Sequence, residues 1–387
     1  MIIAKTVSPV LKIGLRFLGI WPDVSYSAVH LYSFILSMLI VQYFQYVYIM
    51  EHLKISELSN LIDGLAVTFD YSLTLFKIFG LWMHRNVFHK ILADMDNDWL
   101  VSANIAEHSY MMTIKANISH FISNVIFTFN TIVGVFYFLG DYAIRSIIQS
   151  ADYNNTLRQL PIRVQFPFDT QQSPLFEILV ATLFIHVMLH VSIISILNGL
   201  ILTLVAHISG QIDIMCHEFK NISETVLYRE STSITLETQI KRHKRIISFS
   251  ENIEKLFSFI ALMQVIWNTL VICCIGFIII ISIHNDTGVF VLVKSVLAYV
   301  VIMADSFVMC FAGEHLSLKS KLIANAIYET SWYNMPVRQS KVIIFIIMRS
   351  QRRLVITAGK MMDMSFETFT SIMKASASYV SVLNAMY

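Results

Sequence analysis

The sequence is poor in charge and in cysteine, and it lacks a glycine-rich nucleotide motif. Only 14% of its 387 residues are charged and 56% are hydrophobic, whereas about 25% are charged in an average soluble protein. The 12 glycines show neither the GxGxxG nor the GxxxxGK spacing that cradles phosphate groups. The 4 cysteines fall in or beside apolar stretches, which indicates no disulfide framework. These absences exclude a typical nucleotide enzyme and a disulfide-stabilised secreted domain, and they favour a polytopic membrane protein.

Apolar runs long enough to cross a bilayer recur along the chain. A helix needs about 20 apolar residues to span the hydrocarbon core. Such runs lie at 31–51, 58–82, 118–142, 175–206, 256–283 and 289–312, and a more polar one lies at 361–387. We expect an all-α protein with seven transmembrane helices, the last of which needs an argument beyond hydropathy.

Basic residues predict the orientation of these spans. With the N-terminus inside, the inner segments hold twenty lysines and arginines and the outer segments hold four. Basic residues accumulate on the cytoplasmic side, so the N-terminus is expected inside and the C-terminus outside. This is opposite to a G-protein-coupled receptor. The second outer loop carries a sequon that begins at Asn154, a candidate glycosylation site.

The segment 336–356 contains a short apolar helix on the predicted cytoplasmic side. Seven apolar residues run from Val342 to Met348, which is about 10 Å of helix and too short to span. A helix that is apolar on all faces must be buried. Its own bundle and the same helix of neighbouring subunits are both available partners, and we favour the second. A cytoplasmic anchor of this kind would hold an oligomer together.

The last helix is too polar to face lipid on every side. At helical spacing, one stripe is formed by Ser371, Ala375, Ser378, Val382 and Met386. Small and hydroxyl side chains often mediate tight packing between membrane helices, which is one interpretation. The other is a pore lining that is wet along the serines and closed by a ring of apolar side chains near the outer end.

Three stretches near the C-terminus carry a family resemblance: "CFAGEHLSLKSKLIANAIYETSWYNMP", "FIIMRSQRRLVITAG" and "SFETFTSIMKASASYVSVL". The positions in register are Gly313, Glu314, Tyr328, Trp332, Phe366, Phe369, Lys374, Ser378, Tyr379 and Leu383. Through them the chain resembles the insect odorant receptors across essentially its whole length. The N-terminal half matches mainly in its span pattern.

The resemblance implies a ligand-gated, non-selective cation channel of four subunits with a pore lined by the last helix. It implies assembly with a shared co-receptor subunit in the plasma membrane of an olfactory sensory neuron. The co-receptor's insertion is lacking in 207–255, so this chain should be the odour-binding subunit. Alignment on Ser378 and Tyr379 puts the gate at Val382 and Met386. The expected parts are 1–312 with the ligand pocket, 313–356 as the anchor and 357–387 as the pore helix.

The resemblance also implies a pocket for a small volatile in the outer half of the bundle. The positions at that depth are Val67, Asp70, Tyr71, Phe127, Asn130, Thr131, Gly134, Phe138, Tyr299 and Met303. For any one of them taken singly, a packing role is favoured over a ligand contact. A carboxylate at membrane depth is costly unless it is paired or functional, and for Asp70 the expected partner is Lys77 or Lys294.

Other chemistries find little support in the sequence. His186 and His190 share one helix face, but no cysteine or acidic partner completes a metal site, and no cofactor is expected. The basic run 241–245 is expected to face lipid headgroups or solvent, and no nucleic-acid partner is expected. The alternatives are a taste-type channel of the same superfamily and, less favoured, a transporter. The halves lack the self-similarity of a transporter, and no catalytic set points to an enzyme.

Overall fold

The computed structural model describes residues 5–22, 27–53, 58–151, 160–224, 229–284 and 289–386, and these residues form a nearly all-helical chain. Its elements are α1 (Pro9–Phe17), α2 (Ser27–His52), α3 (Leu58–Met83), α4 (Arg85–Ala103), α5 (Ala106–Ala151), α6 (Leu175–Glu224), α7 (Arg229–His284), α8 (Val289–Tyr328), a 3-10 turn (Trp332–Asn334), α9 (Val337–Ser350), β1 (Thr357–Ala358), β2 (Met362–Asp363) and α10 (Phe366–Met386).

Six of these helices, α2, α3 and α5 to α8, are long and apolar enough to cross a membrane. This confirms the six spans that hydropathy predicts. The helices α5 to α8 have 46, 50, 56 and 40 residues. At about 1.5 Å per residue each is well over the ~30 Å of a bilayer core. The apolar runs in the sequence are therefore only the membrane parts of longer helices.

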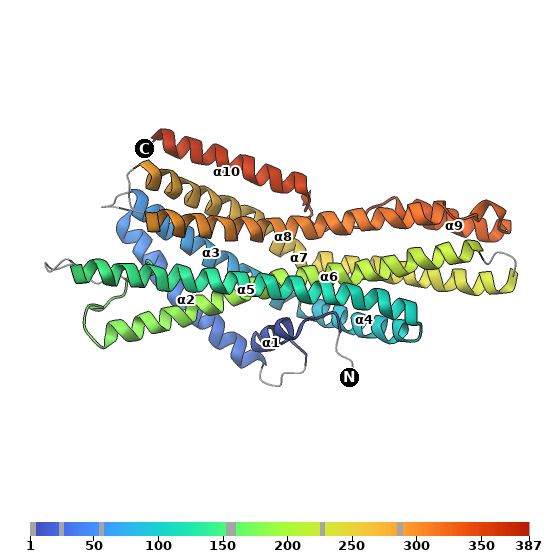
Figure 1. The fold of residues 1–387 in the computed structure, drawn as a ribbon, viewed down its shortest axis with the longest axis horizontal. Helices are drawn as coiled ribbons and strands as arrows, with labels where there is room; N and C mark the ends of the chain where they lie inside the picture. The colour runs from blue at the N-terminus through green and yellow to red at the C-terminus, as the bar shows by residue number, and fades with distance from the viewer. Residues whose placement is uncertain are drawn as a thin grey trace.

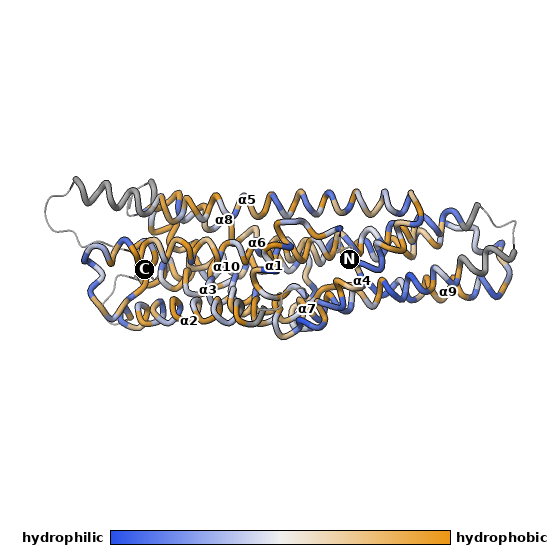
Figure 2. The backbone as a smooth tube through the Cα atoms, turned by 90° about the horizontal axis from the view of Figure 1, so that it is seen from below, coloured by the Kyte–Doolittle hydropathy of each residue, from blue (hydrophilic) through white to orange (hydrophobic). Residues whose placement is uncertain are grey.

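The long helices form one elongated bundle (Figure 1). α5 packs along α6, α3 along α7, and α6 along α8. α9 lies at one end of the long axis and the C-terminal end of α10 lies near the other (Figure 1). Hydrophilic residues are more frequent toward the end that holds α9 (Figure 2), which suits a part of the bundle outside the membrane.

α9 is buried on one face only within the single chain. Ile343 and Ile346 pack into the main core beside α8. Phe345 and Met348 are 69% and 59% exposed. The chain's own bundle therefore buries one face of α9 and leaves the opposite face exposed. Within the single chain, the expectation of burial on all faces is met on one face only.

A small β-hairpin links α9 to α10 and lies against α7. β1 and β2 pair antiparallel around a turn in which Gly359 has φ +59° and Lys360 has φ +62°. The amide of Gly359 donates to the carbonyl of Ser258 at 3.0 Å, and that of Thr357 donates to the Glu254 carboxylate at 2.7 Å. The start of the last helix is thus held against α7.

Candidate ligand site and pore-lining helix

The polar stripe of α10 lies on the open side of the helix in the single chain. Ser371 and Ser378 are exposed, Ala375 is half-buried, and Val382 is 57% exposed. The side chain of Met386 lies outside the described residues. No element within the described ranges covers this face, so it is available to water or to other subunits.

The opposite face of α10 packs on α7. The hydroxyl of Ser376, a buried residue, donates to the carbonyl of Thr269 at 3.3 Å. A Cβ at Gly276 would lie 3.0 Å from the Cγ2 of Val380, so this glycine allows a close approach between the helices. Small residues serve this purpose in membrane bundles. The contact face and the stripe are therefore distinct sides of one helix.

Three residues that carry the family resemblance, Gly313, Glu314 and Phe366, meet at the corner between α8 and α10. A Cβ at Gly313 would lie 2.2 Å from the carbonyl oxygen of Met364, so only glycine fits there without movement. The amide of Phe366 donates to the Glu314 carboxylate at 3.4 Å. A carboxylate at a helix N-terminus is favoured by the unpaired amides there. The ring of Phe307 lies 5.9 Å from that of Phe366. These contacts hold the start of α10 against α8.

Four of the predicted pocket residues lie in two separate apolar clusters, whereas Tyr71 belongs to the main core. One joins α3, α5 and α6 and contains Phe138, with Val67 packed against it. The other joins α3, α7, α8 and α10 through Ile372, with Tyr299 and Met303 packed against it. The second cluster therefore puts two predicted ligand residues in contact with the core that holds the last helix.

The predicted residues of α5 mostly make helix contacts. The side-chain amide of Asn130 donates to the hydroxyl of Ser195 on α6 at 3.0 Å, and the hydroxyl of Thr131 donates to the carbonyl of Phe127 at 2.7 Å. A Cβ at Gly134 would lie 3.1 Å from Met188 of α6. This glycine and the Asn130 contact bring α5 close to α6.

Tyr71 and Asp70 form a polar group with the two histidines of α6. The Tyr71 ring stacks on His190 at 4.1 Å and on His186 at 5.6 Å between centroids, with 5° between planes in both cases. His190 lies 3.7 Å from the Asp70 carboxylate, and its Nε2 lies 2.9 Å from the Thr74 hydroxyl. The histidine pair thus belongs to a ring stack with Tyr71.

The expected ion pair of Asp70 with Lys77 or Lys294 is wrong. The Asp70 carboxylate pairs with His190, whereas the ammonium of Lys77 lies 2.9 Å from both carboxylate oxygens of Asp305. The ammonium of Lys294 lies 4.2 Å from the centre of the Tyr137 ring. The helical spacing of Lys77 from Asp70 was misleading because a neighbouring helix supplies a closer carboxylate.

Asp305 is the centre of a buried polar network that the sequence analysis missed. Lys77 of α3 and Asp305 of α8 are 1% and 4% exposed. The carboxylate also accepts hydrogen bonds from side-chain amides at 2.8, 3.0 and 2.9 Å, donated by Asn198 of α6 and by Gln264 and Asn268 of α7. Charged residues inside apolar runs were the available signal. One carboxylate joins four helices of the bundle.

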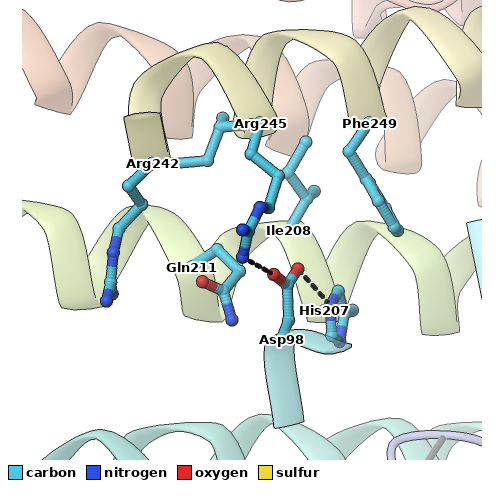
Figure 3. A pocket seen from close by; sticks show the side chains of 8 residues that line it. Asp98, His207, Ile208, Gln211, Arg242, Arg245 and Phe249 are labelled. Atoms are coloured by element: carbon cyan, nitrogen blue, oxygen red, sulfur yellow. Dashed lines mark hydrogen bonds and ion pairs between the residues drawn. The ribbon is translucent and has the colours of Figure 1, made fainter. Parts of the chain in front are cut away.

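A small cavity of about 10 Å³, room for about one water molecule, lies between α4, α6 and α7 (Figure 3). Asp98 of α4 points between His207 and Arg245, at 3.3 and 3.0 Å from their nitrogens (Figure 3). In the same basic run, His243 is buried and bonds Ser350 at 3.3 Å. The expectation that the run faces solvent or lipid is therefore wrong for His243 and for Arg242, whose side chain is 10% exposed and lies 3.6 Å from the Glu218 carboxylate. Arg245 pairs with Asp98 but stays 42% exposed.

The profile of the 7tm odorant receptor family matches residues 57–377 of the chain. The chain belongs to the insect odorant receptor family. The six apolar helices accordingly make it a multi-pass membrane protein. The motif residues around Gly313 and Phe366 lie inside the matched range, at the corner between α8 and α10.

Among the relatives of this odorant receptor, odorant receptor 22c of Drosophila melanogaster is 29% identical over 37% of this chain and 35% of the relative. Odorant receptor Or2 of Anopheles gambiae is 27% identical over 38% of each chain. The aligned stretch thus spans little more than a third of these relatives. The solved olfactory receptor OR5 of Machilis hrabei in complex with eugenol superposes with a TM-score of 0.78, 15% identity and 97% coverage of both chains. The fold is shared over nearly the full length.

Proposed function

We propose that this odorant receptor is the odour-binding subunit of a ligand-gated, non-selective cation channel. Four subunits, including a shared co-receptor, would surround one pore in the plasma membrane of an olfactory sensory neuron. The N-terminus would lie in the cytoplasm, and α10 would be the seventh span. Residues 1–312, 313–356 and 357–387 would serve as ligand-binding bundle, anchor and pore helix. The candidate sequon at Asn154 falls outside the described residues.

The open polar face of α10 is the observation that carries this proposal. Hydroxyl side chains gain nothing from lipid contact, so the exposed Ser371 and Ser378 favour a face turned to water. Val382 follows on the same stripe toward the predicted outer end, where a ring of such side chains could close the path by dewetting. Family membership supports the same role.

The open face of α9 supports assembly into an oligomer. Phe345 and Met348 are exposed on α9, which lies at the end of the bundle where hydrophilic residues are more frequent (Figure 2). Apolar side chains gain about 25 cal/mol per Å² when they leave water, so this face favours a second protein surface. The same helix in adjacent subunits is the simplest partner, as the sequence analysis favours.

The polar network offers a physical route from the pocket to the pore. It joins α3, which carries the predicted pocket residues Val67, Asp70 and Tyr71, and α6 to α7 and α8, which contact α10. Asn268 of α7 precedes Thr269, the acceptor for Ser376, and Asp305 of α8 lies near Phe307, which contacts Phe366. A ligand that binds better to the open arrangement would move these helices together and raise its population.

Electrical recording tests the proposal most simply. Cells that express this chain with the co-receptor should pass cation current within milliseconds of an odour pulse, in the presence of a G-protein inhibitor. Cells that express only one of the two subunits, with an empty vector in place of the other, serve as controls. A response that requires G proteins, or no response across a broad odour panel despite surface expression, would count against it.

A further inference from the structure

The ring stack between α3 and α6 holds polar atoms that the protein does not satisfy. Tyr71 is 3% exposed and His186 is 6% exposed. The Tyr71 hydroxyl is buried without a hydrogen-bond partner among the described residues, and the ring nitrogens of His186 make no hydrogen bond of full geometry there, only a weaker interaction with the backbone of Ser37 on α2. Buried polar groups are nearly always paired, and an unpaired one lowers stability. Two stacked rings whose polar atoms are so poorly paired need an explanation.

The two ends of the stack differ. His190 has the Thr74 hydroxyl at 2.9 Å and the Asp70 carboxylate at 3.7 Å, so the protein itself satisfies that end. The poorly paired atoms belong to the other two rings. A phenol offers a donor and an acceptor, and a neutral imidazole offers one of each. This end can therefore bind a single oxygen atom from either side.

The helices that carry these two rings also carry residues of one apolar cluster. Val67 lies one helical turn before Tyr71 on α3, and Val187 follows His186 on α6. Both belong to the cluster around Phe138. Ligand sites typically combine such apolar walls with a few polar groups that fix orientation. The arrangement suits a molecule with a hydrocarbon body and one polar head.

We propose that Tyr71 and His186 recognise the oxygen of a small volatile alcohol or carbonyl compound, whose hydrocarbon part lies against the cluster of Val67, Phe138 and Val187. This rests on the proposed odour-binding function and names the ligand class and the residues that select it. A hydroxyl ligand donates to one ring and accepts from the other, while a carbonyl oxygen accepts only. A hydrocarbon of the same shape leaves both rings unpaired.

Matched odorant series test this in cells that express the receptor with its co-receptor. Each series keeps one carbon skeleton and presents it as the alcohol, the carbonyl compound and the plain hydrocarbon. The unmodified receptor should respond to the best alcohol or carbonyl at a half-maximal concentration at least tenfold below that of its hydrocarbon. Equal sensitivity within every active series would overturn the inference and leave the channel function standing. No current from any series would overturn the function itself.

Three substitutions locate the effect. Tyr71→Phe removes only the hydroxyl and should raise the half-maximal concentration for the oxygenated ligand about fivefold to tenfold, with little change for the hydrocarbon. His186→Leu should do the same, and His186→Gln, which keeps a donor and an acceptor, should restore part of the loss. Tyr46→Phe is the matched control, because it also removes only a phenolic hydroxyl. That hydroxyl lies 3.1 Å from the Ser72 hydroxyl and is not part of the ring stack.

A stability measurement separates recognition from folding. Removing an unpartnered hydroxyl should leave the melting temperature of the ligand-free Tyr71→Phe receptor unchanged or higher, while its oxygenated-ligand sensitivity falls. A lower melting temperature with both ligand classes affected equally would show a structural role and overturn the inference. If His186→Leu fails to reach the surface, the comparison of His186→Gln with the unmodified receptor on the same series decides for that residue.

Discussion

Asp305→Leu is expected to be the most damaging single change in the buried network. It removes the carboxylate that Lys77 contacts at 2.9 Å and leaves the ammonium of this side chain, which is 1% exposed, without its counter-charge. Breaking a buried pair by removing one partner costs about 3–5 kcal/mol. The side-chain amides of Asn198, Gln264 and Asn268 lose their acceptor as well. We therefore expect a sharply lowered free energy of unfolding.

The reverse change is expected to be milder. In Lys77→Met, the Asp305 carboxylate still accepts from three amide groups, so its charge remains partly satisfied. The loss is that of a charge-assisted hydrogen bond, about 1.5–3 kcal/mol. The double variant Lys77→Met with Asp305→Leu removes both charges and should be more stable than Asp305→Leu alone, with a coupling of about 0.5–3 kcal/mol.

Thermal unfolding of the detergent-solubilised full chain, followed by fluorescence-detected size exclusion, ranks these variants. The expected order of melting temperature is unmodified, Lys77→Met, the double variant and Asp305→Leu, with the middle two close together. Lys321→Met, at an exposed position of α8 outside the network, serves as a control for the loss of a lysine. If Asp305→Leu melts no lower than Lys77→Met, the argument that the amides share the Asp305 charge is refuted.

Two further changes test the corner and the anchor. Gly313→Ala puts a Cβ 2.2 Å from the Met364 carbonyl oxygen, so we expect at least a tenfold loss of odour-evoked current at normal surface density. Electrical recording gives the current and surface labelling gives the density. Unchanged current would show that the corner can shift freely. Phe345→Ser, at a side chain that is 69% exposed, should lower the tetramer fraction of purified complexes, whereas Tyr110→Ser, which is 67% exposed on α5, should not. Equal tetramer fractions in both would mean that α9 is not the anchor.

The sequence predicted the six apolar spans well because hydropathy over about 20 residues depends only on local composition. It did not predict how far α5 to α8 continue beyond their apolar runs. These further parts are more polar, and their limits depend on contacts with neighbouring helices. The seven apolar residues from Val342 to Met348 also suggested burial on all faces. Only the fold reveals that Ile343 and Ile346 pack inward while Phe345 does not.

Partner choice inside the membrane was the weakest part of the sequence analysis. Asp70 and Lys77 lie two turns apart on one helix, which made them natural partners. The nearer carboxylate for Lys77 comes from Asp305, 228 positions away in the chain. Such contacts depend on tertiary packing that periodicity along one helix does not contain. The stripe of α10 was easier, because spacing along one helix is enough to assign its residues to a common face.

Cysteine accessibility at Val382 tests the central claim, that α10 lines an odour-gated pore, most directly. In receptors with Val382→Cys, a charged, membrane-impermeant thiol reagent applied from outside should reduce the odour-evoked current, and faster during odour exposure than at rest. Leu383→Cys, on the side of α10 that packs against Phe277 of α7, and the unmodified receptor with its four native cysteines should be little affected. If Val382→Cys is labelled and the current stays unchanged, or if Leu383→Cys is blocked equally, α10 does not line the pore in this way.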